Sequence, residues 1–162
     1  MGLLFFSATK AHGFVPGVFM KNQDQAILHE IQKNTHMGLE AIDAMMPRVK
    51  DEVFAKELAG QSVKYGEYYE KASDRLSLES DRLYKDVKGK DLVLRSSIWM
   101  QTFMDGSSGH MADMMIQGVN RGITDLQKVL NHNRHASNEI IRLATDVMDM
   151  EEQVINRLRE YL

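Results

Sequence analysis

The sequence predicts an all-α protein, a four-helix bundle, and three observations support this prediction. Across residues 92–131, small and apolar residues recur at alternating steps of four and three, the spacing of a buried seam on a helix packed in a bundle. Proline, which interrupts helices, occurs only at positions 16 and 47 of 162. No segment shows the polar–apolar alternation of a half-buried strand. The seam is Ile98, Thr102, Asp105, Gly109, Ala112, Ile116, Val119, Ile123, Leu126 and Leu130.

Two helices are predicted in the first half of the chain. The first spans about residues 24–46, because Asp24 can cap its start and Pro47 ends it. Its seam is Leu28, Ile31, Thr35, Gly38, Ile42 and Met45. The second begins near Asp51 and extends to about residue 85. Its seam is Phe54, Leu58, Gln61, Tyr65, Tyr68, Ala72 and Leu76.

Two further helices are predicted over residues 92–131 and 136–161. The first of them keeps its phase across Asp105–Gly109, a stretch that would normally break a helix, and Asp105 can equally cap a helix that restarts after a kink. The seam of the last helix is Ile140, Ala144, Val147, Glu151, Val154, Leu158 and Tyr161. Short turns within each pair make two antiparallel hairpins.

The connection between the two hairpins has two interpretations. Residues 74–104 form either an extended hairpin beyond the bundle or a long crossover along it. The short turn at Asp86–Lys90 favours the hairpin.

Residues 1–20 form an apolar N-terminal extension to the bundle of residues 21–162. Its apolar run is not preceded by the basic residues of a signal peptide, and it is too short to span a membrane. We therefore expect the extension to dock on the bundle. The absence of cysteine excludes disulfides, zinc–thiolate sites and cysteine nucleophiles, and fits the cytoplasm. A net charge of −3 with interspersed signs excludes a nucleic-acid footprint, and a membrane role is not expected.

A homo-oligomer, most simply a dimer, is the expected assembly. The helix at 92–131 is apolar beyond its seam, and three other helices cannot cover all of it. Either a second subunit or the extension at residues 1–20 must cover the remainder. The additional apolar residues are Trp99, Met100, Phe103, Met104, Met111, Met114 and Met115.

The segments Asn34–Gly38 and Ser108–Gly118, placed on two helical hairpins, resemble an uncharacterised bacterial branch of the ferritin-like superfamily. The resemblance covers about residues 24–162 and implies an up-down four-helix bundle. It also implies two metal ions, with iron the foremost candidate, held by one Glu from each of two helices and a Glu-x-x-His from each of the other two.

That ligand set does not carry over to this sequence. Glu-x-x-His occurs nowhere in the chain. Glu30 and His36 fall off the seam of the first helix, and Glu67 and Glu70 fall off the seam of the second. Oxidase, ferroxidase and iron-storage functions are therefore not expected.

Three residues could form a non-standard metal site. Glu151 lies in the seam of the last predicted helix, although a charged residue normally lies on the solvated face. His110 and Asp113 lie on one face of their helix, because they are three residues apart. Together the three residues could bind one metal through nitrogen and oxygen ligands. The alternative is a buried hydrogen-bonded network in which His110 pairs with Asp113, and Glu151 pairs with Tyr65 or Gln117.

A copper(I) site is a weaker alternative. Met100, Met104, Met111, Met114 and Met115, with His110, are soft ligands suited to that ion. Methionine at helical spacing more commonly fills core gaps, and we favour that interpretation.

Two functions follow from this sequence, with a third of less support. The first is a non-catalytic structural or interaction protein that keeps the ferritin-like fold without its metal centre. The second is a metal-binding or redox protein that uses His110, Asp113 and Glu151. The third is a membrane or assembly contact through residues 1–20.

Overall fold

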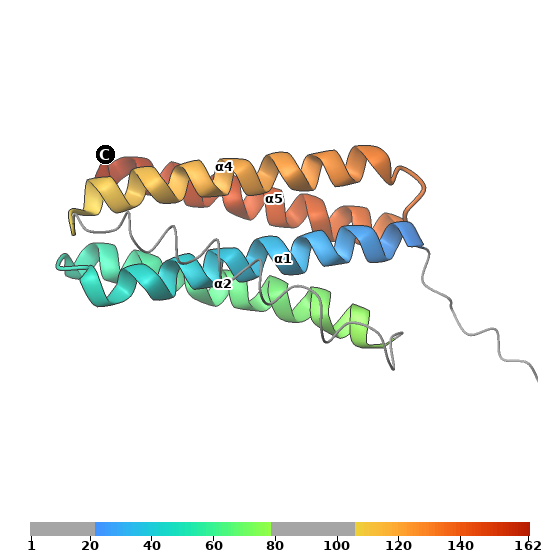
Figure 1. Cartoon of the computed structure of the whole chain (residues 1–162), viewed down its shortest axis with the longest axis horizontal. Coiled ribbons are helices and arrows are strands. Elements are labelled where there is room, and N and C mark those ends of the chain that lie inside the picture. Colours follow the sequence, from blue (N-terminus) through green and yellow to red (C-terminus); the bar gives the residue numbers. More distant parts are fainter. Residues whose placement is uncertain (1–21, 79–105) are drawn as a thin grey trace, which may run out of the picture.

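The computed structural model describes residues 22–78 and 106–162. These residues form four α-helices that lie along one long axis (Figure 1). The predicted all-α four-helix bundle is thereby confirmed, whereas the extension at residues 1–20 lies outside the described residues. No helix among residues 22–78 and 106–162 is long and apolar enough to span a membrane.

The first hairpin joins α1 (Asn22–Met45) to α2 (Glu52–Ser77) through a short 3-10 turn, Met46–Arg48. Pro47 lies in that turn and ends α1, as predicted. Asp51 caps α2, because its carboxylate accepts hydrogen bonds from the backbone amides of Val53 and Phe54 at 2.8 and 3.3 Å. Both helix boundaries at this turn therefore follow from local sequence signals. The predicted end of α2 at residue 85 lies outside the described residues.

The second hairpin joins α4 (Ser108–His132) to α5 (Asn138–Leu158), which continues as a 3-10 turn at Arg159–Tyr161. The prediction of one unbroken helix over residues 92–131 is wrong, because Gly106 and Ser107 are not helical. The Ser107 hydroxyl accepts a hydrogen bond from the His110 amide at 3.3 Å and caps a new helix start. Asp105, the residue we considered for this role, lies outside the described residues.

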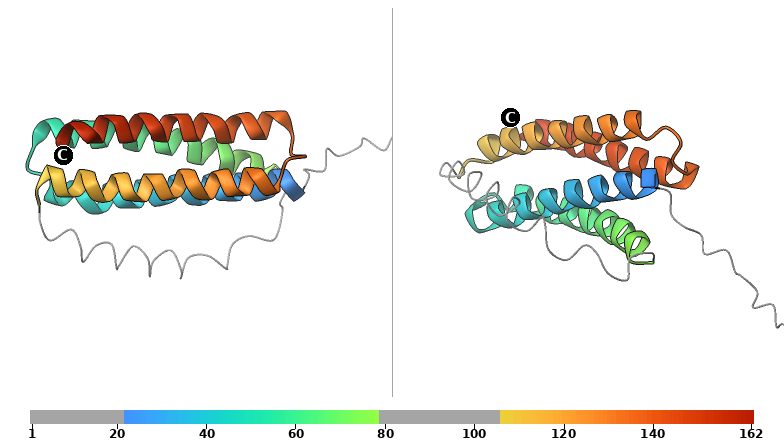
Figure 2. Two further views of the ribbon diagram at one scale, coloured as in Figure 1. Left: turned by 90° about the horizontal axis from the view of Figure 1, so that it is seen from above. Right: turned by 45° about the vertical axis from the view of Figure 1, so that its right-hand side comes forward.

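The helices α2 and α4 run parallel, so the predicted up-down order, in which successive helices are antiparallel, is wrong. The hairpin predicted for residues 74–104 lies almost entirely outside the described residues. Phe54 and Met111, near the starts of the two helices, belong to one cluster of the hydrophobic core. Leu76 and Leu126, near their ends, belong to the other cluster. The end of α2 and the start of α4 therefore lie at opposite ends of the bundle (Figures 1 and 2).

The predicted seams of α1, α2 and α5 are buried, except that Gly38, Tyr68 and Tyr161 are half-buried. The buried face of α4 differs from its predicted seam. Met111 and Met115 are buried in the core, whereas Ile116, Ile123 and Leu130 are only half-buried. Two methionines assigned to an outer face of α4 thus pack inside the bundle. The expected dimer contact through this helix stays a prediction, because Trp99, Met100, Phe103 and Met104 lie outside the described residues.

Candidate functional site

A small polar cluster lies inside the bundle, among mostly apolar core side chains. Glu151 on α5 is 1% exposed, and its carboxyl group has one partner on each of two other helices. The amide of Asn34 on α1 donates a hydrogen bond to Oε2 of Glu151 at 3.1 Å. The phenol of Tyr65 on α2 donates to Oε1 at 3.5 Å. Three helices therefore meet at one buried carboxyl group.

Two glycines make room for the partners of Glu151. A Cβ atom added at Gly38 on α1 would lie 2.8 Å from the ring of Tyr65. A Cβ atom added at Gly122 on α4 would lie 2.3 Å from Oδ1 of Asn34. Glycine lowers the stability of a helix interior, but at these two positions it allows the side chains of Tyr65 and Asn34 to approach the helix backbone closely. All four helices thus contribute to the cluster.

Replacing Gly38 with alanine is expected to destabilise the protein by about 1–3 kcal/mol, because the buried Tyr65 ring must move to accept the methyl group. Gly66 is the matched control on α2, since a Cβ atom there would meet nothing within 4 Å. Gly66→Ala is expected to stabilise the protein by about 1 kcal/mol through helix propensity. Chemical denaturation of both variants measures the difference. Equal effects of the two substitutions would contradict the close packing at Gly38.

Burial dominates the electrostatics of the cluster. Desolvation raises the pKa of Glu151 from 4.5 to about 8, although the hydrogen bonds from Asn34 and Tyr65 act in the opposite direction. Desolvation, followed by the nearby Glu151 charge, also raises the pKa of Tyr65 well above its usual value of 10. Both groups are therefore neutral at pH 7. A neutral carboxyl group that is hydrogen-bonded to an amide and a phenol can remain buried in the core. A substrate could reach it only if the helices moved apart.

Two other polar side chains lie in the seams of α1 and α2. The Thr35 hydroxyl donates a hydrogen bond to the Ile31 carbonyl at 2.8 Å, within its own helix. Gln61 is 3% exposed and donates to Glu57 at 3.0 Å, while its Oε1 has no hydrogen-bond partner. These two buried seam positions could carry the carboxylates of a di-metal site, but in this chain they carry the hydroxyl of Thr35 and the amide of Gln61.

The three residues considered for a metal site do not come together. Glu151 is buried among α1, α2 and α5, whereas Asp113 is exposed on α4 and accepts a hydrogen bond from Gln117 at 3.0 Å. His110 is half-buried in the first turn of α4. Within residues 22–78 and 106–162, no three histidine, aspartate or glutamate side chains are grouped so that they could hold a metal ion.

The residue types at the cluster do not fit the two metal ions that the ferritin-like resemblance implies. The Asn34 amide presents N–H bonds to the carboxyl group, and a nitrogen that carries hydrogens in this way is not a metal ligand. Glu151 would have to give up both hydrogen bonds and its proton before it could coordinate a cation. Of the residues considered for copper(I), Met111 and Met115 are buried in the core and His110 is half-buried. Met100 and Met104 lie outside the described residues.

Sequence reasoning identified Glu151 and its partner Tyr65 but missed Asn34. The predicted seam of the first helix contains Thr35 but not the preceding residue, Asn34, yet the side chains of both residues are buried. The available signal was the run Ile27, Ile31, Asn34 and Gly38 at steps of four, three and four, which defines a second seam beside the first.

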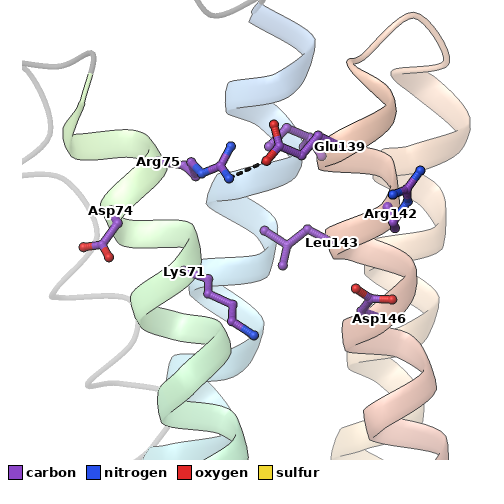
Figure 3. A pocket seen from close by; sticks show the side chains of 8 residues that line it. Lys71, Asp74, Arg75, Glu139, Arg142, Leu143 and Asp146 are labelled. Carbon is purple, nitrogen blue, oxygen red and sulfur yellow. Dashed lines mark hydrogen bonds and ion pairs between the residues drawn. The ribbon is translucent and has the colours of Figure 1, made fainter.

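A cleft lies between α2 and α5, near the end of α2 (Figure 3). An ion pair between Arg75 and Glu139 crosses it. This pairing raises the pKa of Arg75 and lowers that of Glu139. The other lining residues are Lys71, Asp74, Ile140, Arg142, Leu143 and Asp146. Because acidic and basic side chains alternate around the cleft, it selects neither anions nor cations.

Comparisons with protein-family models, with curated proteins and with solved structures find no match for this chain.

Proposed function

We propose that this protein is a non-catalytic structural or interaction protein of ferritin-like architecture that does not use a di-metal centre. One observation carries the proposal: the buried carboxyl group of Glu151 is hydrogen-bonded to Asn34 and Tyr65, and within residues 22–78 and 106–162 it is not grouped with other acidic or histidine side chains that could hold a metal ion. Catalysis by a carboxylate requires access to substrate or to a metal. At 1% exposure, Glu151 has no such access and serves as a hydrogen-bonded element of the core instead.

The helix order supports the ferritin-like part of the proposal. Four-helix bundles with only short loops place successive helices antiparallel, whereas ferritin-like bundles contain one long crossover connection. Here α2 and α4 are parallel, with their starts in one core cluster and their ends in the other. Two antiparallel hairpins whose middle helices are parallel have the helix order of a ferritin-like bundle.

Elemental analysis of the full chain, purified without a tag, tests the function. We expect iron, manganese, zinc and copper each to be well below one equivalent, and unfolding to be unaffected by a chelator. The comparison variants are Glu151→Gln and Asp113→Asn, which remove one candidate ligand each with little change in shape. A near-stoichiometric metal that is lost in either variant would contradict the proposal and favour the metal-binding alternative at His110, Asp113 and Glu151.

A further inference from the structure

The outer face of α2 carries exposed apolar and small residues that no other described helix covers. Val53 and Val63 are 66% and 63% exposed, unlike most large apolar side chains of the described helices. Ala59 and Gly60 are also exposed, one turn before Val63. A Cβ atom added at Gly60 or Gly66 would meet nothing within 4 Å. These glycines weaken the helix without serving any contact in the described part of the chain.

Charged residues flank the central part of this apolar patch, Ala59–Val63, in a self-complementary order. Glu52 and Lys56 lie on one side of it, and Glu67 and Lys71 lie on the other. All four are exposed, and none takes part in an ion pair among residues 22–78 and 106–162. Lys56 and Glu67 are about 16 Å apart along the helix, too far to pair within one chain.

Antiparallel pairing of two copies of α2 accounts for the central part of the patch, Ala59–Val63, and for these four charges, whereas Val53 falls opposite the exposed Glu70. If Val63 of one copy packs against Gly60 of the other, the same register places Lys56 opposite Glu67 and Glu52 opposite Lys71. A two-fold axis repeats each contact, so the surface is complementary to itself. The open space at Gly60 allows the two helices to approach closely.

We propose that the outer face of α2, from Glu52 to Lys71, is a homodimer interface in which two copies of α2 pair antiparallel. This inference names a partner for the proposed interaction role and rests on that role. The two can nevertheless fail separately, because metal content tests the function and association tests the surface.

A charge-swap series tests the interface and its register. Sedimentation equilibrium of the full chain is expected to show a mass that rises towards a dimer with concentration. Lys56→Glu and Glu67→Lys should each weaken the dimer by on the order of tenfold, because each creates two like-charge contacts. The double variant, with both charges exchanged, should restore association. Glu152→Lys, an exposed charge change on α5, is the control and should have no effect.

A steric variant separates loss of association from loss of folding. Gly60→Leu places its side chain in open space in the single chain but in the contact region of the dimer. We expect a folded, helical and monomeric protein by circular dichroism and sedimentation. Three results would overturn the proposal: a monomer at every concentration of wild-type protein, a dimer that tolerates all of these variants, or a double variant that stays monomeric. The first of these would indicate that another segment of the chain covers the face.

Discussion

Replacing Glu151 with glutamine is expected to remove a large pH-dependent loss of stability. In the native protein the pKa of Glu151 is raised to about 8 by burial, whereas in the unfolded chain it returns to about 4.5. Below the lower value both states carry the proton, and stability is not affected. Between the two values the unfolded chain has lost the proton that the native state retains, so stability falls as pH rises, by at most about 1.4 kcal/mol per pH unit.

The whole effect is on the order of 5 kcal/mol and is complete near pH 8, where the native carboxyl group itself ionises. Glutamine preserves the shape and does not titrate. The free energy of unfolding of Glu151→Gln, minus that of wild type, should therefore increase by several kcal/mol between about pH 5 and about pH 9. Urea denaturation at a series of pH values measures this difference.

The matched control is Glu152→Gln, the same chemical change at the next residue, which is exposed. Its difference from wild type should stay nearly constant with pH. A flat difference for Glu151→Gln as well would show that the Glu151 carboxyl group is solvated or bound to a cation in the native protein.

Replacing Asn34 with aspartate is expected to be the most damaging near-isosteric change in the core. Asn34 donates to Glu151 at 3.1 Å, and a carboxylate in its place would face a second carboxyl group with most of its solvent removed. Two such groups share one proton, so at least one uncompensated charge stays buried at neutral pH. We expect a loss of about 3–5 kcal/mol at pH 7 that becomes smaller as the pH is lowered and the second group is protonated.

Asn34→Ala separates the charge from the lost hydrogen bond. It should cost only about 1–2 kcal/mol, with little additional pH dependence. If Asn34→Asp were as stable as wild type at neutral pH, the interior would have to contain solvent or a counter-ion at this position. Such a result would contradict a dry hydrogen-bonded cluster.

Local sequence signals predicted the helix boundaries at the turn between α1 and α2, because they act within a few residues. Pro47 and Asp51 define the turn between α1 and α2, and each acts through its own backbone or side chain. Glu151 was also predictable as a buried group, since a carboxylate within an apolar seam must enter the core with its helix. Its hydrogen-bond partners depend on how the neighbouring helices are rotated about their axes. The sequence of one helix does not determine that rotation.

Two other features depend on contacts that are distant in sequence. The buried face of α4 differs from its predicted seam. Gly122, which is not a seam position, lets Asn34 approach closely, and the seam position Gly109 lies against the Tyr161 backbone and buries no side chain. The order of the helices depends on where the chain goes after α2. The turn signal at Asp86–Lys90 indicates a local reversal but does not determine which end of the bundle α4 starts from.

The protonation state of Glu151 tests the central claim, a neutral buried carboxyl group in place of a metal centre, most directly. The measurement is the carbon-13 chemical shift of its side-chain carboxyl group as a function of pH, assigned by the loss of that signal in Glu151→Gln. We expect a titration midpoint near pH 8, from the pKa of about 8 that burial imposes. A midpoint at or below its usual pKa of 4.5 in the folded protein would contradict the account, because only solvent or a bound cation could keep the group ionised there.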